Sequence, residues 1–353
     1  MGARDGGEER GHWVSRLLSW YGEAARNLPW RRTKDPYAIW ISEIMLQQTR
    51  VAAVEGFYHR FLSEFPTLGD LARADIERVL KAWEGLGYYS RARNLHRAAG
   101  IVEEQHGGSL PADYEALLEL PGVGPYTAGA LGSIAFDLPH PAPDGNAFRV
   151  FARLFGYAED TGAARGKRIL TELMRDYLPI NSPGRYNQAI MELGALVCIP
   201  GKPRCGACPL VADCRAFADG TQDRIPLVVP RRKPREKSRC AFVVERGDEL
   251  LMIRRPEGVL LAGFWEFPGG ECGEGETPGA VLQRLELELA DVQSLGQYRC
   301  TFSGEHWRVR VFRGSWTRGP LAADIDGCWF APPEFADITL ARAFRPIARM
   351  IDR

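Results

Sequence analysis

The sequence of 353 residues lacks any apolar run long enough to cross a membrane, and it carries no net charge because 45 basic residues balance 45 acidic ones. Its first ten residues, MGARDGGEER, lack the apolar core of a secretory signal, and Gly6 stands where a myristoylation motif has serine or threonine. We therefore expect an intracellular protein with no membrane partner. In that compartment the eight cysteines are expected to be metal ligands or free thiols rather than disulfides.

Strand signals are also scarce before residue 215, whereas helical periodicity recurs there. A chain of this length exceeds one typical hydrophobic core, so two domains are expected. The sequence predicts an all-α domain over residues 8–221, a basic linker over residues 222–239 and an α+β domain over residues 240–353.

The predicted linker is unusually basic. Residues 224–239 read RIPLVVPRRKPREKSR, with seven basic residues, one acid and three prolines. This composition fits either a solvated spacer or a strap along a DNA backbone. From Cys240 onward 13 arginines stand against 17 acids, so the part before it carries a net charge of +4. This uneven distribution of charge permits a nucleic-acid-binding face on the first domain.

The stretch 120–150, LPGVGPYTAGALGSIAFDLPHPAPDGNAFRV, organises the first domain. Pro121 ends one helical pattern, and Pro125 suits the first turn of the next. Gly122 and Gly124 permit positive φ and leave backbone amides uncovered. Amides at a helix N-terminus bind anions such as a DNA phosphate, so the pattern is that of a helix-hairpin-helix. An ordinary αα-hairpin with a glycine loop is the other interpretation.

Two acidic positions are candidates for acid–base chemistry. Glu43 follows the helix start Asp35-Pro36, and Ile39 and Leu46 lie on its helix face. A lone carboxyl there is desolvated and its pKa raised, which suits a general acid, although an exposed charge is the commoner situation. The triplet Asp144-Gly145-Asn146 places a second acid at the start of a further helix. A phosphate clamp beside such carboxyls indicates chemistry on DNA.

Two short segments combine aromatic residues with arginine or glycine. Leu28-Pro29-Trp30-Arg31-Arg32 fits either a solvated connector or an edge that stacks on a base. Trp83–Ser90 holds two glycines around Leu86, which looks exposed. It fits either a helix C-cap with core aromatics or a wedge inserted into a base stack. Polar Gln48 and Thr49 end the helix that carries the first candidate acid.

A cluster of four cysteines ends the helical region. The spacing Cys-x6-Cys-x2-Cys-x5-Cys indicates a metal site in an intracellular protein. Zinc and iron–sulfur centres both accept four cysteines, and the spacing matches neither zinc knuckles nor ferredoxins. Lys202 and Arg204 lie in the first loop, where a metal would hold them as phosphate contacts. The four cysteines are Cys198, Cys205, Cys208 and Cys214.

The expected elements follow from periodicity and turn residues. Helices of the first domain are expected at His12–Arg26, Phe148–Tyr157, Lys167–Leu178 and Pro183–Cys198. In the second domain a hairpin is expected from Ala241–Glu245 and Glu249–Arg254. Further strands are expected at Ser294–Phe302, Trp307–Phe312 and Gly327–Phe330, and helices at Ala280–Leu289 and Ala341–Ile351.

The first domain resembles the helix-hairpin-helix DNA glycosylases, and its details match the MutY-type adenine DNA glycosylases over nearly the whole chain. The matching segments are Leu28–Arg31, Ser42–Thr49, Trp83–Ser90, Leu120–Ala128, Asp144–Asn146, Asn187–Ala189 and Glu192–Cys198. The cysteine spacing is also the family's, and the family carries a 4Fe-4S cluster there. The resemblance, and not the spacing, implies iron–sulfur rather than zinc.

The second domain contains LAGFWEFPGG over Leu261–Gly270 and resembles the Nudix-related domain that reads 8-oxoguanine in this family. Hydrolytic Nudix proteins bind a divalent metal with adjacent acids on a helix, whereas residues 284–289 here read RLELEL. Metal-dependent hydrolysis is therefore not expected. The family's reading loop is Phe-Ser-His, whereas this chain has Phe302-Ser303-Gly304. Ser303 carries over, but the histidine does not unless His306 reaches back.

The resemblance implies an enzyme of base excision repair that hydrolyses the N-glycosidic bond of adenine opposite 8-oxoguanine or G in duplex DNA. Glu43 would protonate the base, and Asp144 would stabilise the oxocarbenium-like sugar. Tyr126 and Asn146 would orient this pair. The adenine pocket would be formed by Trp30, Arg31, Leu46 and Gln188. The DNA and the 8-oxoguanine would be contacted by Gln48, Thr49, Leu86, Tyr88, Gly122, Gly124 and Ser303.

Strand nicking is not expected from this sequence. Related lyases of the endonuclease III type have a nucleophilic lysine at the position of Tyr126, and no lysine occurs between Leu120 and Val150. The implied protein is a monofunctional, monomeric glycosylase, cytoplasmic and associated with the nucleoid. Three other readings are a thymine-mismatch glycosylase of the same fold, a non-catalytic DNA-binding module and an electron carrier that uses the cluster.

Overall fold

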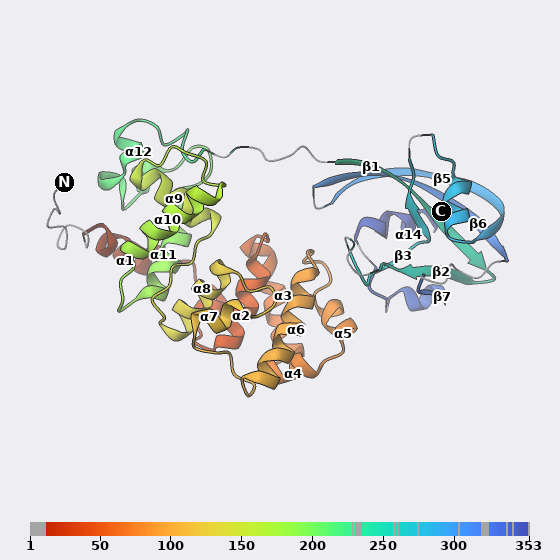
Figure 1. The fold of residues 1–353 in the computed structure, drawn as a ribbon, viewed down its shortest axis with the longest axis horizontal. Helices are drawn as coiled ribbons and strands as arrows, with labels where there is room; N and C mark the ends of the chain where they lie inside the picture. Colours follow the sequence, from red (N-terminus) through yellow and green to blue (C-terminus); the bar gives the residue numbers. More distant parts are fainter. Residues whose placement is uncertain are drawn as a thin grey trace. The chain divides into compact units, whose positions relative to one another are not determined.

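The computed structural model describes residues 12–227, 229, 235–256, 259, 261–273, 275–302, 304–318, 325–336, 338–340 and 342–351. The chain divides into two compact units, Met1–Val229 and Pro230–Arg353. The first unit is helical and the second contains a sheet (Figure 1), which confirms the predicted fold class. The predicted start of the helical domain, residues 8–11, and linker residues 228 and 230–234 lie outside the described residues.

The first unit is built from helices, and none of residues 12–227 lies in a strand. Its helices are α1 (His12–Ala24), α2 (Pro36–Leu46), α3 (Val51–Glu64), α4 (Leu68–Arg73), α5 (Ile76–Ala82), α6 (Ser90–Gln105), α7 (Tyr114–Leu118), α8 (Pro125–Phe136), α9 (Gly145–Phe155), α10 (Ala164–Asp176), α11 (Pro183–Leu196) and α12 (Arg215–Ala218). Short 3-10 turns cover η2 (Pro29–Arg31), η3 (Cys205–Ala207) and η4 (Val211–Asp213).

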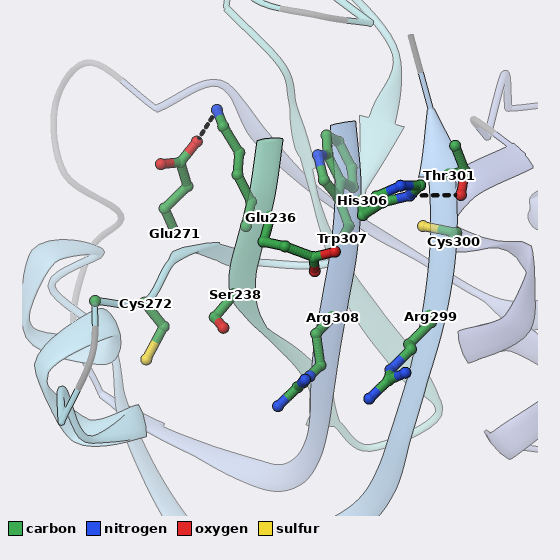
Figure 2. A pocket seen from close by; sticks show the side chains of 12 residues that line it. Glu236, Ser238, Glu271, Cys272, Arg299, Cys300, Thr301, His306, Trp307 and Arg308 are labelled. Carbon is green, nitrogen blue, oxygen red and sulfur yellow. Dashed lines mark hydrogen bonds and ion pairs between the residues drawn. The ribbon is translucent and has the colours of Figure 1, made fainter. Parts of the chain in front are cut away.

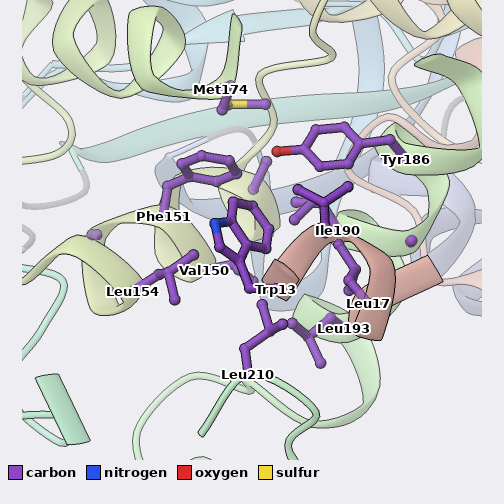
Figure 3. Packing of buried hydrophobic residues seen from close by; sticks show 14 of the residues in the cluster. Trp13, Leu17, Val150, Phe151, Leu154, Met174, Tyr186, Ile190, Leu193 and Leu210 are labelled. Carbon is purple, nitrogen blue, oxygen red and sulfur yellow. The ribbon is translucent and has the colours of Figure 1, made fainter. Parts of the chain in front are cut away.

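These helices pack as two neighbouring groups. Helix α2 packs against α3 and α8 in one group, and α9 packs against α10, α11 and α12 in the other. The N-terminal α1 joins the second group through α11, and there Trp13 lies beside the rings of Phe151 and Tyr186 (Figure 3). The ring of Tyr177 also contacts Trp13. Helix α11 also contacts α8, so it lies at the junction of the two groups.

Polar caps and prolines set the helix starts that matter for function. Asp35 accepts hydrogen bonds from the amides of Tyr37 and Ala38, so α2 begins where predicted. Asp144 likewise caps α9 by accepting from the amide of Ala147. The prediction that this helix begins at Phe148 was wrong, because the Asp144 cap starts it at Gly145.

The hairpin turn between α7 and α8 is formed as predicted, with one correction. Gly122 has a φ of +80°, and a Cβ there would lie 2.8 Å from the Cβ of Asn94, so this position requires glycine. Gly124 instead has a φ of −102° and caps α8 in an extended conformation, with Pro125 as the first helical residue. The expectation of positive φ therefore holds for only the first of the two glycines.

The second unit contains one mixed sheet. Its strands are β1 (Arg235–Arg246), β2 (Glu249–Arg254), β3 (Trp265–Glu266), β4 (Gly269–Glu271), β5 (Glu288–Phe302), β6 (Glu305–Arg318) and β7 (Gly327–Phe330). The main order is β3-β2-β1-β6-β5, with β4 beside β1 and β7 beside β2. The β1–β6 pair is parallel, and the predicted β1–β2 hairpin is present.

Helices and short turns complete the second unit. Helix α13 (Pro278–Arg284) packs on one face of the sheet, with Val281 in a cluster that includes Phe242 and Val244. The C-terminal elements are η5 (Pro332–Ala336), η6 (Arg342–Phe344) and α14 (Arg345–Ile351). Phe344 lies beside the ring of Trp307.

The helix predicted over Ala280–Leu289 was wrong in its second half. The chain leaves the helix after Arg284 because Glu286 adopts a φ of +55°. Glu288 then lies in β5, where its carboxylate pairs with Arg318 at 2.9 Å. The two acids of the RLELEL segment therefore do not share a helix face.

Candidate active site

Glu43 lies in the second half of α2 and points into the protein interior. Only 5% of its surface is exposed, which confirms the expected desolvation. The Tyr126 hydroxyl donates a hydrogen bond of 2.6 Å to its Oε2. Burial raises the pKa of Glu43 to about 7, although the Tyr126 hydrogen bond opposes this shift. A carboxyl with that pKa is available as a proton donor at neutral pH.

Asp144 faces a different set of donors at the N-terminus of α9. Its Oδ1 accepts from the Ala147 amide at 2.6 Å, and its Oδ2 accepts from the Asn146 side-chain amide at 2.8 Å. Burial raises the pKa of Asp144, while these hydrogen bonds act to lower it. Glu43 accepts one such bond from a side chain, so Asp144 has the environment that better supports a carboxylate.

Small residues let the catalytic elements approach one another. A Cβ on Gly129 of α8 would lie 2.0 Å from the Pro141 carbonyl oxygen, in the loop that leads to Asp144. A Cβ on Gly194 of α11 would lie 2.6 Å from the Cβ of Asn146. Both separations are far below normal contact, so side chains at these glycines would push Asp144 and Asn146 away from Glu43.

The two acids line one cavity of about 180 Å³, together with every residue predicted for catalysis and for the adenine pocket. An engineered cavity of about 150 Å³ accepts benzene, so this space suits a single base ring system. The predicted residues that line it are Glu43, Asp144, Tyr126, Asn146, Trp30, Arg31, Leu46 and Gln188. Thr49, predicted as a DNA contact, lines it as well.

Glu192 of α11 also lines this cavity and was not singled out from the sequence. Its carboxylate accepts paired hydrogen bonds from Arg26 at 2.6 and 2.9 Å and from Arg31 at 2.8 and 3.0 Å. Burial alone would raise the pKa of Glu192, but these bonds lower it to about 2. The cavity therefore contains three charged side chains, Arg26, Arg31 and Glu192, beside Glu43 with its raised pKa.

A hydrogen-bond chain connects Asp144 to the first cysteine of the cluster. Asn146, which donates to Asp144, accepts at 2.7 Å from Arg149, and Arg149 donates at 2.7 Å to the Cys198 carbonyl. Arg149 also donates to the Gly194 carbonyl at 2.8 Å. The position of the second acid therefore depends on the loop that carries the cysteines.

Two known families match the two parts of this chain. Residues 41–176 match the family described as HhH-GPD superfamily base excision DNA repair protein, and residues 240–350 match the NUDIX domain. The chain is 35% identical to the adenine DNA glycosylase of Mus musculus over 96% of this chain and 77% of that protein. It is 35% identical to the adenine DNA glycosylase of Homo sapiens over 95% of this chain and 73% of that protein.

The chain belongs to the adenine DNA glycosylase family. It is therefore a base excision repair enzyme that acts on N-glycosyl bonds. Among solved structures, a thermostable thymine-DNA glycosylase superposes with a TM-score of 0.56 at 30% identity, over 60% of this chain and 98% of that one. None of the described helices of this glycosylase is long and apolar enough to cross a bilayer.

The four cysteines of this glycosylase meet around one small cavity. Cys198, Cys205, Cys208 and Cys214 all line it. Arg153, only 2% exposed, donates to the Cys198 sulfur at 3.3 Å and to the carbonyls of Ile199 and Gly201. Within the described residues no group of His, Cys, Asp or Glu is close enough to hold a single metal ion.

A second concavity lies beside the first. It has a volume of about 790 Å³ and is bounded by Gly124 of the hairpin turn, Gln48, and Lys167 and Arg168 of α10. It shares Leu46, Tyr126 and Asp144 with the smaller cavity, so the two lie side by side. Gly122 lies in the same turn as Gly124 but does not line this groove.

Arg91 holds together the segments predicted to contact DNA, and the sequence did not point to it. It is 8% exposed and donates to the carbonyls of Ile44, Met45 and Gln47 at 2.6–2.8 Å. It also donates to the Gly87 carbonyl at 3.0 Å and to the Thr49 hydroxyl at 3.2 Å. One guanidinium thus joins the end of α2 to the turn before α6.

The interpretation of Leu86 as an exposed side chain was wrong. Leu86 is 8% exposed, whereas Tyr88 is 44% exposed and has a φ of +49°. The helix α2 ends at Leu46, and the exposed Gln48 follows with a φ of +57°. In this structure Gln48 and Tyr88, rather than Leu86, are therefore available on the surface.

The hairpin between β5 and β6 carries the predicted reading loop. Ser303 lies outside the described residues. Gly304 has a φ of +80°, a conformation that strains any other side chain except asparagine or aspartate. His306 is hydrogen-bonded through Nδ1 to the Thr301 hydroxyl at 2.9 Å, which holds it on the strand pair.

Proposed function

We propose that this glycosylase removes adenine from duplex DNA in which the opposite base is 8-oxoguanine or G. The observation that carries the proposal is the shared cavity. Glu43, whose carboxyl has a pKa of about 7, lines this cavity together with Asp144, whose hydrogen bonds favour the ionised carboxylate. The names of the relatives support adenine as the excised base.

The proposed reaction begins with extrusion of the adenine nucleotide into this cavity, which costs a few kcal/mol of unstacking. Because Tyr126 donates to Oε2 of Glu43, Oε1 remains to carry the acidic proton. Transfer of that proton to a ring nitrogen makes adenine a better leaving group. The C–N bond then breaks, and Asp144 stabilises the oxocarbenium-like sugar as a carboxylate.

Water completes the reaction at the anomeric carbon. Glu43, now ionised, accepts a proton from this water and returns to its starting state. The ionised pair of Arg31 with Glu192 forms a polar wall that orients the base, and Trp30 and Leu46 supply apolar walls. Asn146 holds Asp144 through its hydrogen bond of 2.8 Å.

We propose a monofunctional enzyme without strand-nicking activity. Tyr126 occupies the position at which a Schiff-base lysine would act, and no lysine lines the cavity among the described residues. Borohydride treatment during the reaction is therefore expected to yield no covalent protein–DNA adduct. Efficient trapping of such an adduct would contradict this assignment.

Backbone contacts to DNA are proposed for the groove beside the cavity. The amides of the turn at Gly122 and Gly124, at the start of α8, would bind a DNA phosphate. Gln48 lines the groove and Thr49 lines the cavity, and the exposed Tyr88 fits stacking in the duplex. Ser303 is proposed as an 8-oxoguanine contact on the resemblance alone. The enzyme is proposed to act as a monomer.

The four cysteines are proposed to hold a 4Fe-4S cluster. The donor set fits, because four thiols line one cavity and a 4Fe-4S cluster takes four cysteine ligands. A bound cluster would fix the loop that carries Lys202 and Arg204 beside DNA and would anchor the chain of hydrogen bonds to Asp144. Iron and acid-labile sulfide near four per chain are expected; stoichiometric zinc would contradict the proposal.

The test of substrate uses matched duplexes with A opposite 8-oxoguanine, A opposite G, and T opposite G. Release of adenine from the first two with an intact strand supports the proposal. The structural likeness to a thymine-DNA glycosylase makes the third duplex the decisive control. Faster release of thymine than of adenine would replace the proposal with the thymine-mismatch activity.

A further inference from the structure

The second unit has its own polar pocket, with a volume of about 760 Å³, near the hairpin between β5 and β6. It is lined by residues from β1, β4, β5 and β6. Among them Arg299 and Arg308 lie side by side on neighbouring strands and point in the same direction (Figure 2). These two residues are direct partners in the β5–β6 register.

Neither arginine has an acidic partner among the described residues, whereas several other arginines of the sheet do. Arg313 pairs with Glu245 at 2.7 Å, and Arg318 pairs with Glu288 at 2.9 Å. Arg299 and Arg308 are both exposed and form no ion pair or hydrogen bond with any described residue. Two like charges directly opposite each other on a sheet are destabilising.

The remaining charges of the pocket leave this pair in excess. Lys237 pairs with Glu271 at 2.5 Å and with Glu305, which does not line the pocket, at 3.2 Å. Among the described residues that line the pocket, Glu236 is then the one carboxylate left to balance the charge of the two guanidinium groups. Ser238 adds a hydroxyl and His306 its second ring nitrogen to the same pocket, because the Thr301 hydroxyl and the His306 Nδ1 are bonded to each other. A pair of forked guanidinium groups beside such donors suits a phosphate oxygen pair.

The position of the pair on the hairpin identifies the source of the phosphate. Phe302 and Glu305 close the hairpin, so Arg299 and Arg308 each lie three residues from its end. At about 3.3 Å per residue this separation is about 10 Å, on the scale of one or two nucleotides of backbone. A strand whose base is read at the tip would therefore bring its backbone over this pocket.

We propose that Arg299 and Arg308 form a phosphate site for the DNA strand opposite the target adenine. The inference rests on the proposed function, because that function places the 8-oxoguanine strand at this hairpin. The site contributes affinity for the backbone without reading the sequence, since phosphates carry no base identity. It therefore supports the reading hairpin in a chain whose loop has Gly304 in place of the histidine.

The test measures DNA binding by the full chain with Glu43→Gln as background, so that the duplex stays intact. The double variant Arg299→Gln/Arg308→Gln is compared with Arg318→Gln, a matched control on the same strand β6. Dissociation constants are measured over a salt series for a duplex with A opposite 8-oxoguanine and for an undamaged duplex. Loss of each phosphate contact reduces the slope of log K against log salt by about 0.9.

The proposal expects the slope to fall by about two for the double variant on both duplexes and to stay unchanged for the control. Methylphosphonate substitution within two nucleotides of 8-oxoguanine should weaken binding of the parent protein but not of the double variant. The same substitutions on the adenine strand should weaken both proteins equally. The melting temperature should stay constant or rise, because a like-charge pair is removed.

Three results would overturn the proposal. Identical salt slopes for the parent protein and the double variant would show that the two arginines do not contact a phosphate. A marked drop in melting temperature would assign the arginines to stability. Binding of pyrophosphate that is lost in the double variant, with identical DNA slopes, would assign the pocket to free phosphates. None of these readouts depends on base release, so they stay separate from a failure of the proposed adenine excision.

Discussion

Tyr126→Phe tests the acid–base assignment, because it should raise the pKa of the catalytic acid rather than lower it. The Tyr126 hydroxyl donates to Glu43 at 2.6 Å and so favours the ionised carboxylate. Removing that bond should raise the pKa of Glu43 further above 7. A hydrogen bond to a charged group contributes about 1.5–3 kcal/mol, and each pKa unit corresponds to 1.36 kcal/mol, so the expected shift is about one to two units.

The assay is the pH dependence of adenine release under single-turnover, subsaturating conditions, which reports groups of the free enzyme. The parent enzyme should lose activity above a midpoint near 7, because Glu43 then loses its proton. In Tyr126→Phe this alkaline limb should move to higher pH, whatever happens to the maximal rate. Tyr37→Phe is the matched control, since the Tyr37 hydroxyl bonds to the Phe65 carbonyl instead. An unmoved limb, or one displaced to lower pH, would refute the assignment.

Three further perturbations test the site, each followed by denaturant unfolding of the helical unit with far-ultraviolet circular dichroism. The raised pKa of Glu43 stabilises the folded protein below pH 4.5, and this stability is lost as the pH rises through about 7. The free energy of unfolding of the parent should therefore fall by about 3 kcal/mol between pH 4 and pH 8, a loss that Glu43→Gln should not show. Equal pH slopes of the two proteins would contradict this. The lowered pKa of Glu192 stabilises the folded protein above pH 4.5, and this stability is lost as the pH falls through about 2. Glu192→Gln should therefore be about 3 kcal/mol less stable than the parent near neutrality and equally stable in strong acid. A difference in unfolding free energy that stays constant with pH would contradict the ion network. Arg91→Met leaves the carbonyls of Ile44, Met45 and Gln47 without their donor and should cost at least about 3 kcal/mol, with Arg91→Lys intermediate; a loss below about 1 kcal/mol would show that the clamp is dispensable.

Local signals were sufficient for the elements that begin with a cap or a proline. Asp35 and Asp144 each accept from backbone amides within three residues, and Pro36 and Pro125 suit the first helical position, so the sequence alone indicates these starts. The period change after Cys240 likewise indicated the sheet of the second unit. The burial of Glu43 could be expected because apolar residues surround it on its own helix.

Long-range partners explain what the sequence did not indicate. Glu192 acquires its charge through Arg26 and Arg31, which lie more than 160 residues earlier in the chain. In the sequence Arg91 is an ordinary helix arginine. Its role depends on hydrogen bonds to α2 and to the turn at Gly87, which only the folded chain brings to it. Leu86 looked exposed between glycines, but tertiary packing buries it.

Backbone conformation accounts for the remaining differences. Glu286 at positive φ ends α13 early, although the apolar pattern would continue the helix to Leu289. Gly124 takes an extended conformation rather than a left-handed one, because a helix cap needs it. Such choices depend on which neighbours the chain meets, and no local pattern specifies them.

The most direct test of a neutral Glu43 is difference infrared spectroscopy of the parent enzyme against Glu43→Gln across pH. A protonated-carboxyl band should be present at pH 6 in the parent only, and it should disappear with a midpoint near 7. A carboxyl that titrates near its ordinary value of 4.5, with no such band at pH 6, would contradict the proposed mechanism.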